Sequence, residues 1–136
     1  AKHTTFHPNG SPHVVTPLVG NLPEGTIQEF LPDGEPLSTK EVHQGVQDGW
    51  TVLYENGEVV SKIPYQNGSI NGIEEHYKDG NILATQITWV AGMRHGPTFH
   101  YAGDNITTDW YFHDKLVSKS DYEILTNYAM RNRNID

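Results

Sequence analysis

Residues 49–71 read GWTVLYENGEVVSKIPYQNGSIN, and this stretch decides the fold. It holds two runs of β-branched and aromatic residues, and an Asn-Gly pair follows each run. Asn-Gly between β-prone runs is the strongest short signal for a hairpin, because both residues accept the positive φ that a tight turn requires. The stretch therefore predicts one strand–turn–strand unit, which a second short turn joins to the next unit.

The unit recurs along the chain. The first glycine series, at intervals of 24, 23 and 24 residues, is Gly25, Gly49, Gly72 and Gly96. The two other series that keep step with it are Gly10, Gly34, Gly57, Gly80 and Gly103, and Gly20, Gly45, Gly68 and Gly92. The aromatic series in the same phase is Phe6, Phe30, Tyr54, Tyr77 and Tyr101. Several series in phase predict a repeat protein rather than a chance spacing.

A turn is expected after each aromatic residue of this series. The expected turn centres are Asn9, Asp33, Asn56 and Asp79. Short connections make neighbouring strands antiparallel. Residues 1–117 are therefore predicted to form an all-β, single-layer antiparallel β-meander of roughly nine or ten strands. Aromatic side chains in one column then recur on every second strand, roughly 9–10 Å apart.

The repeat unit resembles a known family. The pattern G-x-x-x-x-Y-x-N-G, an apolar strand and then Y-x-N-G is similar to the MORN repeat, and more closely to its bacterial YwqK-type variant, described as an antitoxin component. Residues 49–71 are the best copy, and the resemblance covers roughly residues 1–117. The last unit departs from the pattern, because Asp114 stands where the third glycine series would continue. The resemblance implies about five MORN-like hairpin repeats.

The resemblance also implies a function. Such repeats bind partners, and the YwqK-type variant implies an antitoxin or immunity protein that masks a toxin or secreted effector. A bacterial protein is implied, with a periplasmic or secreted location favoured over a cytoplasmic one. Two alternatives stay open: a lipid- or membrane-associated MORN module, and a carbohydrate-acting β-repeat protein.

The pattern changes at Ser118, so residues 118–136 are treated as a second segment. Ser120 and Glu123 match the S-x-x-E capping box of a helix start. The apolar residues at helical spacing are Ile124, Leu125, Tyr128 and Ala129. We expect a short helix at about residues 120–131 that caps the open edge of the last strand. The alternative is a helix that binds a partner.

The charge balance limits the classes of partner. The chain carries 9 Lys and Arg against 17 Asp and Glu, for a formal net charge of −8. Nucleic-acid binding and membrane binding both depend on clusters of basic residues, which this sequence lacks. We therefore expect no nucleic-acid partner, we regard membrane binding as disfavoured, and we expect a neutral or basic protein partner.

Catalytic and metal-binding patterns are weak in this sequence. There is no cysteine, no nucleophile elbow and no phosphate-binding glycine loop before a helix. Glu74 and Glu75 are adjacent, so on a strand their side chains point to opposite faces. His76 and His100 share a repeat column and are the weak metal candidates, but a zinc site needs three or four ligands. We expect neither catalysis nor a cofactor.

The aromatic residues of the central units are the candidates for protein binding. A single-layer sheet cannot bury both of its faces, and aromatic side chains dominate binding hot spots. The candidates are Trp50, Tyr65, Trp89 and Trp110. The alternative interpretation is that they pack the one internal face of the sheet.

Overall fold

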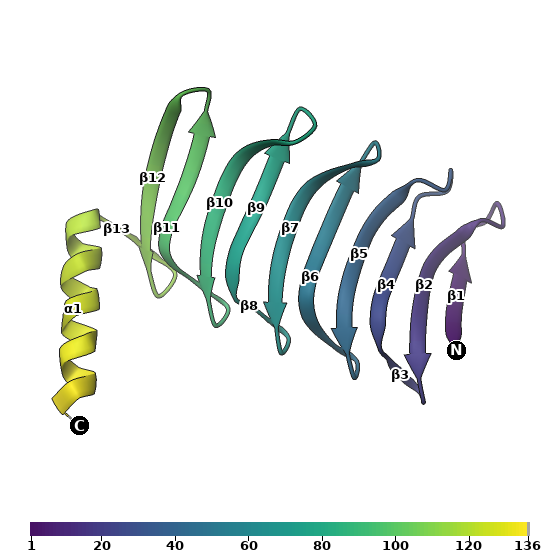
Figure 1. Cartoon of the computed structure of the whole chain (residues 1–136), viewed down its shortest axis with the longest axis horizontal. Coiled ribbons are helices and arrows are strands. Elements are labelled where there is room, and N and C mark those ends of the chain that lie inside the picture. The colour runs from purple at the N-terminus through teal and green to yellow at the C-terminus, as the bar shows by residue number, and fades with distance from the viewer. Residues whose placement is uncertain (136) are drawn as a thin grey trace.

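The structure is a computed structural model that describes residues 1–135, and the side chains of residues 1–132. Its strands form one antiparallel sheet, and a single helix, α1 (Lys119–Ile135), follows them (Figure 1). The strands are β1 (Lys2–Phe6), β2 (Pro12–Val19), β3 (Leu22–Pro23), β4 (Gly25–Phe30), β5 (Pro36–His43), β6 (Val46–Glu55), β7 (Glu58–Gln66), β8 (Ser69–Ile70), β9 (Gly72–Lys78), β10 (Ile82–Val90), β11 (Met93–Ala102), β12 (Asn105–Phe112) and β13 (Lys115–Val117).

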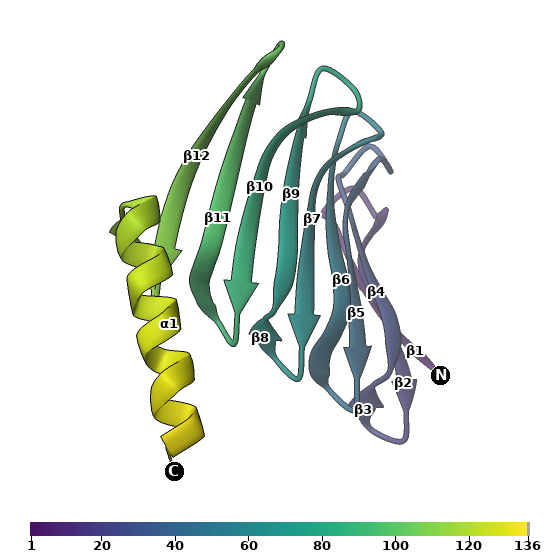
Figure 2. The ribbon, with the colours of Figure 1, turned by 60° about the vertical axis from the view of Figure 1, so that its left-hand side comes forward.

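Sequence order and spatial order coincide in this sheet. The hydrogen-bonded path runs from β1 to β13, and only β3 and β8 lie off it, paired with β2 and β7. Figure 2 shows the strands as one twisted layer, with no second sheet against either face. The predicted fold, an antiparallel β-meander with a C-terminal helix, is therefore confirmed.

The strand count exceeds the prediction. Ten strands have five or more residues, as expected, but β3, β8 and β13 are additional short strands. β3 and β8 each end just before Gly25 or Gly72, whose φ angles are 110° and 119°. In β6 and β11 the same short segment joins the long strand, with Gly49 or Gly96 inside it. β3 and β8 are thus the first residues of long strands that are interrupted near a positive-φ glycine, and β13 is the short strand that pairs with β12 before the helix.

The predicted turns are present at all four centres, Asn9, Asp33, Asn56 and Asp79. Asn56 and Gly57 have φ angles of 54° and 78°, so both central residues of that turn are left-handed, as in a type I′ hairpin. The two wider turns are held differently. Their Asn9 and Asp33 side chains accept hydrogen bonds from the backbone N–H groups two residues later, at 3.0 and 2.9 Å.

Backbone hydrogen bonds connect each repeat to the next. The connecting turns between successive hairpins lie at the other ends of the strands from the turns at Asn9, Asp33, Asn56 and Asp79. In four of these connecting turns, one backbone N–H donates a hydrogen bond to a carbonyl of the preceding repeat, at 2.8 Å in every case. The four donor and acceptor pairs are Gly45 to Pro23, Gly68 to Gln47, Gly92 to Ile70 and Asp114 to Arg94. These turns therefore stack with the same period as the sequence repeat, and one backbone hydrogen bond joins each turn to the preceding repeat.

A side chain strengthens each of these contacts. The residue before each first-series glycine accepts a hydrogen bond from the first left-handed residue of the next turn. The four acceptors are Glu24, Asp48, Asn71 and His95. Asp114, which replaces a glycine in the last repeat, keeps a φ of 71° and also accepts from the N–H and Nε of Arg94. The last turn therefore keeps its left-handed conformation and its contact with the preceding repeat, although Asp114 replaces the glycine.

The helix begins earlier and ends later than predicted. Ser118, not Ser120, caps it: the Ser118 hydroxyl accepts from the Asp121 N–H at 3.0 Å, and its carbonyl accepts from the Tyr122 N–H. The predicted capping box at Ser120 and Glu123 was wrong, because the chain leaves β13 at Val117 and turns immediately. Figures 1 and 2 both show α1 beside β12, at the end of the sheet far from β1.

We predict that Gly57→Val and Gly80→Val each destabilise the protein, by about 1–3 kcal/mol. Both glycines have positive φ, 78° and 94°, and β-branched residues disfavour that conformation. Thermal and urea unfolding would measure the change. Unchanged stability in both variants would contradict the role of these turns.

Ala91→Asn should do the reverse and stabilise the protein, by about 0.5 kcal/mol or more, because Asn tolerates the left-handed region better than Ala. Ala91 has a φ of 50°, and the equivalent positions in neighbouring repeats hold Asn67 and Gln44. The backbone bond from the Ala91 N–H to Asn71 Oδ1 does not depend on the side chain. A lower unfolding temperature for this variant would contradict the prediction.

Candidate functional site

The strand register separates the four predicted binding residues onto two faces. Trp50 lies opposite Pro64, and the adjacent Gly49 lies opposite Tyr65. Residues opposite one another in an antiparallel pair share a face, and adjacent residues alternate. Trp50 and Tyr65 therefore point to opposite sides of the sheet.

The same rule places the other two tryptophans. Tyr65 shares its face with Ser61, which pairs with His76 in β9. Gly72, four residues before His76, pairs with Trp89, so Trp89 joins Tyr65 on what we call the Trp89 face. Trp110 pairs with Pro97 and lies on the opposite face, which we call the Trp50 face.

A row of large side chains lies opposite the first glycine series, on the Trp89 face. The residues that pair with Gly25, Gly49, Gly72 and Gly96 are Val42, Tyr65, Trp89 and Tyr111. We call the last three the aromatic row. A glycine leaves space on its strand that an aromatic ring opposite it can cover. Sequence reasoning missed Tyr111, although its spacing from Trp89 is close to the repeat period.

Polar contacts hold two members of the aromatic row. The Trp89 Nε1–H donates to Glu74 Oε1 at 3.0 Å. The Arg94 guanidinium lies over the Tyr111 ring, 4.3 Å from its centroid. All three aromatic side chains are half-buried. The row is therefore partly accessible, and these contacts fix the orientation of Trp89 and Tyr111.

Small polar residues occupy the space between the larger side chains of the Trp89 face. The buried polar residues are Ser38, Thr51, Ser61, Glu74 and Thr98, and Val42 is a buried apolar residue beside them. All of them lie on this face by register. This face therefore buries few side chains, and most of them are polar. The stability of the repeat therefore depends largely on backbone hydrogen bonds between strands.

The two histidines proposed as weak metal candidates have other partners. His76 contacts Ser61 Oγ through Nδ1 at 2.8 Å and Glu74 Oε2 through Nε2 at 2.5 Å. His100 Nε2 lies 3.2 Å from Asp109 Oδ2. Among the residues whose side chains are described, no three His, Cys, Asp or Glu side chains form a group that could hold a metal ion. Glu74 and Glu75 point to opposite faces, as the sequence predicted.

The Trp50 face carries a hydrogen-bonded chain of its own. The Tyr77 hydroxyl donates to Glu75 at 2.8 Å, Gln86 Nε2 donates to the other Glu75 oxygen at 2.8 Å, and Tyr101 donates to Gln86. Burial, and then the Glu75 carboxylate, raise the pKa of the Tyr77 phenol above its ordinary value.

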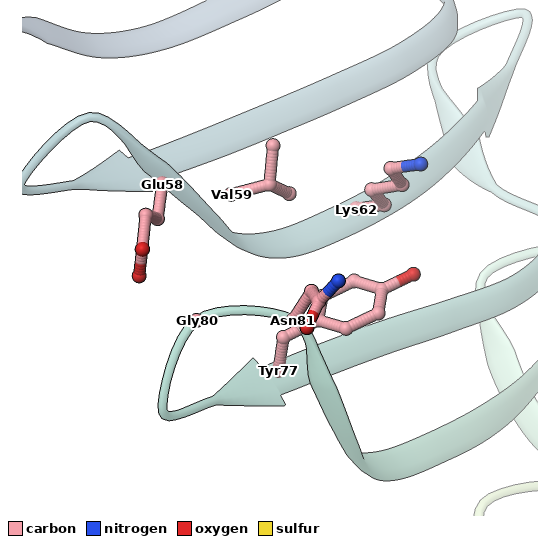
Figure 3. A pocket seen from close by; sticks show the side chains of 6 residues that line it. All are labelled: Glu58, Val59, Lys62, Tyr77, Gly80 and Asn81. Atoms are coloured by element: carbon pink, nitrogen blue, oxygen red, sulfur yellow. The ribbon is translucent and has the colours of Figure 1, made fainter.

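Figure 3 shows the hollow beside this chain, between the β6–β7 and β9–β10 hairpins. It has a volume of about 490 Å³, and its lining residues are Glu58, Val59, Lys62, Tyr77, Gly80 and Asn81. The side chains come from two neighbouring hairpins, so the hollow is the open space between successive turns.

Helix α1 covers part of the Trp50 face. Trp110 packs against Tyr122 of the helix, with 4.9 Å between ring centroids, and the Lys119 ammonium lies 5.9 Å from the Trp110 ring centroid. Trp110 thus anchors the helix. Trp50, on the same face but far from the helix in the strand order, is 43% exposed.

Two histidines, His95 and His113, lie near the start of β11 and just after the end of β12, and His95 contacts the helix. The His95 ring lies 5.7 Å from Tyr122, 4.8 Å from Phe112 and 5.0 Å from His113. Burial, and then the neighbouring His113, lower the pKa of the His95 imidazole. A hollow of about 460 Å³ opens beside it, toward Ala129 and Met130 of the helix.

Comparison with known proteins identifies no relative: no family model, no curated protein and no solved structure matches the chain. The MORN-like resemblance therefore stays a prediction from the sequence motifs. Among the described residues, no helix is both long and apolar enough to cross a membrane.

We predict that acid weakens the contact between α1 and the sheet through His95. Its pKa is lower in the folded protein than its ordinary value, so protonation favours the unfolded chain. This penalty is absent at neutral pH and grows as the pH falls below about 6.5, the ordinary pKa of histidine. The unfolding temperature should therefore fall less between pH 7.5 and pH 5.5 in His95→Gln than in the wild type. An equal fall in both proteins would contradict this role.

Proposed function

We propose that the protein is a non-catalytic protein-binding repeat scaffold, and that the aromatic row on the Trp89 face is its binding surface. The observation that supports this is the position of Tyr65, Trp89 and Tyr111, one in each successive repeat and each opposite a glycine. Two strand spacings separate neighbours in the row, roughly 9–10 Å. An extended partner segment that crosses the strands could therefore contact one aromatic ring per repeat.

The row has the physical properties of a binding surface. Aromatic rings contribute much contact area, and little conformational entropy is lost when they are already fixed before binding. The hydrogen bond from Trp89 to Glu74 and the cation–π contact of Arg94 with Tyr111 fix two of the three rings. Trp110 is excluded from the surface, because its ring packs against Tyr122 of α1.

We propose a narrower version for the partner, namely a toxin or secreted effector that this protein masks as an antitoxin or immunity protein. The support is the YwqK-like pattern of residues 49–71 together with a net charge of −8, which favours a basic partner. Identification of proteins bound to the tagged chain, followed by a toxicity assay of the main partner with and without it, tests this version. A partner whose toxicity is unaffected would contradict it.

We predict that Trp89→Ala and Tyr65→Ala each weaken binding to such a partner by about 2 kcal/mol, or roughly 30-fold in Kd, the usual scale of a hot spot. Trp50→Ala is the matched control, because Trp50 lies on the opposite face and is 43% exposed. Circular dichroism would first establish that each variant is folded. Weaker binding in Trp50→Ala, with wild-type binding in the other two, would move the site to the Trp50 face.

Association should also depend on salt. The net charge of −8 attracts a basic partner at long range, and dissolved ions screen that attraction. Stopped-flow or surface-based kinetics should therefore show an on-rate that falls as the salt concentration rises, with a smaller change in the off-rate. An on-rate that is independent of salt would contradict an electrostatically steered partner.

A further inference from the structure

The Trp89 face brings together a serine, a histidine and a glutamate that are apart in the sequence. Ser61 and His76 are direct neighbours across β7 and β9, and Glu74 lies two residues before His76 on the same face. Ser61 Oγ lies 2.8 Å from His76 Nδ1, and His76 Nε2 lies 2.5 Å from Glu74 Oε2. A nucleophile within hydrogen-bond reach of a base, with the base oriented by a third group, is the arrangement that activates a serine.

The direction of the hydrogen bonds follows from the donors present. The Trp89 indole N–H can only donate, so Glu74 Oε1 is an acceptor. With the carboxylate ionised, Oε2 also accepts, and it takes the Nε2–H of a neutral His76 imidazole. His76 Nδ1 is then unprotonated and accepts the hydroxyl proton of Ser61. With these directions, Trp89, Glu74, His76 and Ser61 are joined by three hydrogen bonds. The same arrangement leaves the His76 Nδ1 lone pair directed at the Ser61 hydroxyl, where it can accept the proton.

Burial divides the roles within the group. The Glu74 side chain is 11% exposed and the His76 side chain 36% exposed. Ser61 is 6% exposed, and Tyr65 and Trp89 of the aromatic row share its face. The helix packs on the other face, against Trp110. The imidazole is therefore partly open on this side of the sheet, whereas Ser61 and the carboxylate are largely buried, so only a small acyl donor that passes beside the imidazole can reach Ser61.

We propose that Ser61 is an acyl-accepting nucleophile, with His76 as its general base and Glu74 as the residue that positions His76, and that small activated esters are its acyl donors in a single acylation without turnover. Ser61 Oγ attacks the carbonyl carbon of the ester, and the hydroxyl proton passes to His76 Nδ1. The carbon–oxygen bond to the leaving group breaks, and the leaving oxygen keeps the electron pair and receives that proton. The products are acyl-Ser61 and a free alcohol or phenol. This inference does not rest on the proposed binding function.

The repeat supplies an internal control. Ser38 occupies the same column one repeat earlier and is also 6% exposed, but its neighbour across β5 and β6 is Leu53 rather than a histidine. The two serines thus share burial and face, but their neighbours on the other side also differ: Ser38 pairs with Glu29 in β4, and Ser61 pairs with Leu53 in β6. Greater reactivity at Ser61 than at Ser38 therefore supports the proposal, and the His76→Gln variant isolates the contribution of His76.

The test uses p-nitrophenyl acetate and the full chain, with peptide mass spectrometry to locate the acetyl group. We expect Ser61 to be acetylated about 10²-fold faster than Ser38, at the lower end of the range for general base catalysis. The difference should disappear in His76→Gln, which keeps a polar side chain but no base, and circular dichroism would show that this variant is folded. Equal labelling of Ser61 and Ser38, or unchanged labelling of Ser61 in His76→Gln, would overturn the proposal.

The role of Glu74 requires a separate measurement, because its loss could also disturb packing. The acylation rate of Ser61 would therefore be measured as a function of pH. The other groups that face His76 across the neighbouring strands are Ser61 in β7 and Thr85 in β10, with His100 beyond Thr85 in β11. Glu74→Gln removes the carboxylate that accepts from the His76 Nε2–H, so the pH profile of the rate should change and the plateau rate should fall. A lower rate with an unmoved pH profile would show that Glu74 does not position His76.

Discussion

The stack of left-handed turns is the feature on which the rest of this structure depends. Each turn needs two successive residues with positive φ, and each delivers one backbone N–H to a carbonyl of the preceding repeat at 2.8 Å. A single-layer sheet has no second layer to define the distance between its repeats. These bonds, with the side-chain acceptor before each first-series glycine, join neighbouring repeats at one end of the strands, in addition to the ladder pairs between them. The tolerance of Asp114 at a glycine position shows that the conformation and the bond matter more than the residue type.

The two faces of the sheet acquire different chemistry from the same repeat. Opposite the first-series glycines, the Trp89 face has room for large rings, and serines, threonines and a glutamate lie buried between them. The Trp50 face carries a chain of polar contacts through Tyr77, Glu75, Gln86 and Tyr101, and the helix covers one end of this face. A thin sheet of this kind buries little apolar surface, so the polar contacts must be satisfied in order not to cost stability.

One hydrogen bond links the proposed binding row to the proposed nucleophile: it runs from Trp89 of the row to Glu74 of the Ser61 group. The indole N–H holds the carboxylate, and the carboxylate holds the His76 imidazole. A ligand that moves the Trp89 ring would therefore also change the setting of His76. The two proposals remain separable by experiment, because one is measured by partner affinity and the other by acylation of Ser61.

The sequence by itself determined the repeat period, the turn positions and the antiparallel order, because turn chemistry is local. Asn-Gly and Asp-Gly pairs specify a backbone conformation wherever they occur. It also predicted a helix after Val117, although the capping residue was Ser118 rather than Ser120. Only the tertiary structure decided which side chains meet. The register shifts near Lys40, Leu53, Leu83 and Ile87, where one strand of the pair has one extra residue (near Leu53 and Leu83) or two extra residues (near Lys40 and Ile87). Counting along the chain therefore could not separate Trp50 from Tyr65 and Trp89, and could not bring Ser61 to His76, because those relations depend on pairing between strands.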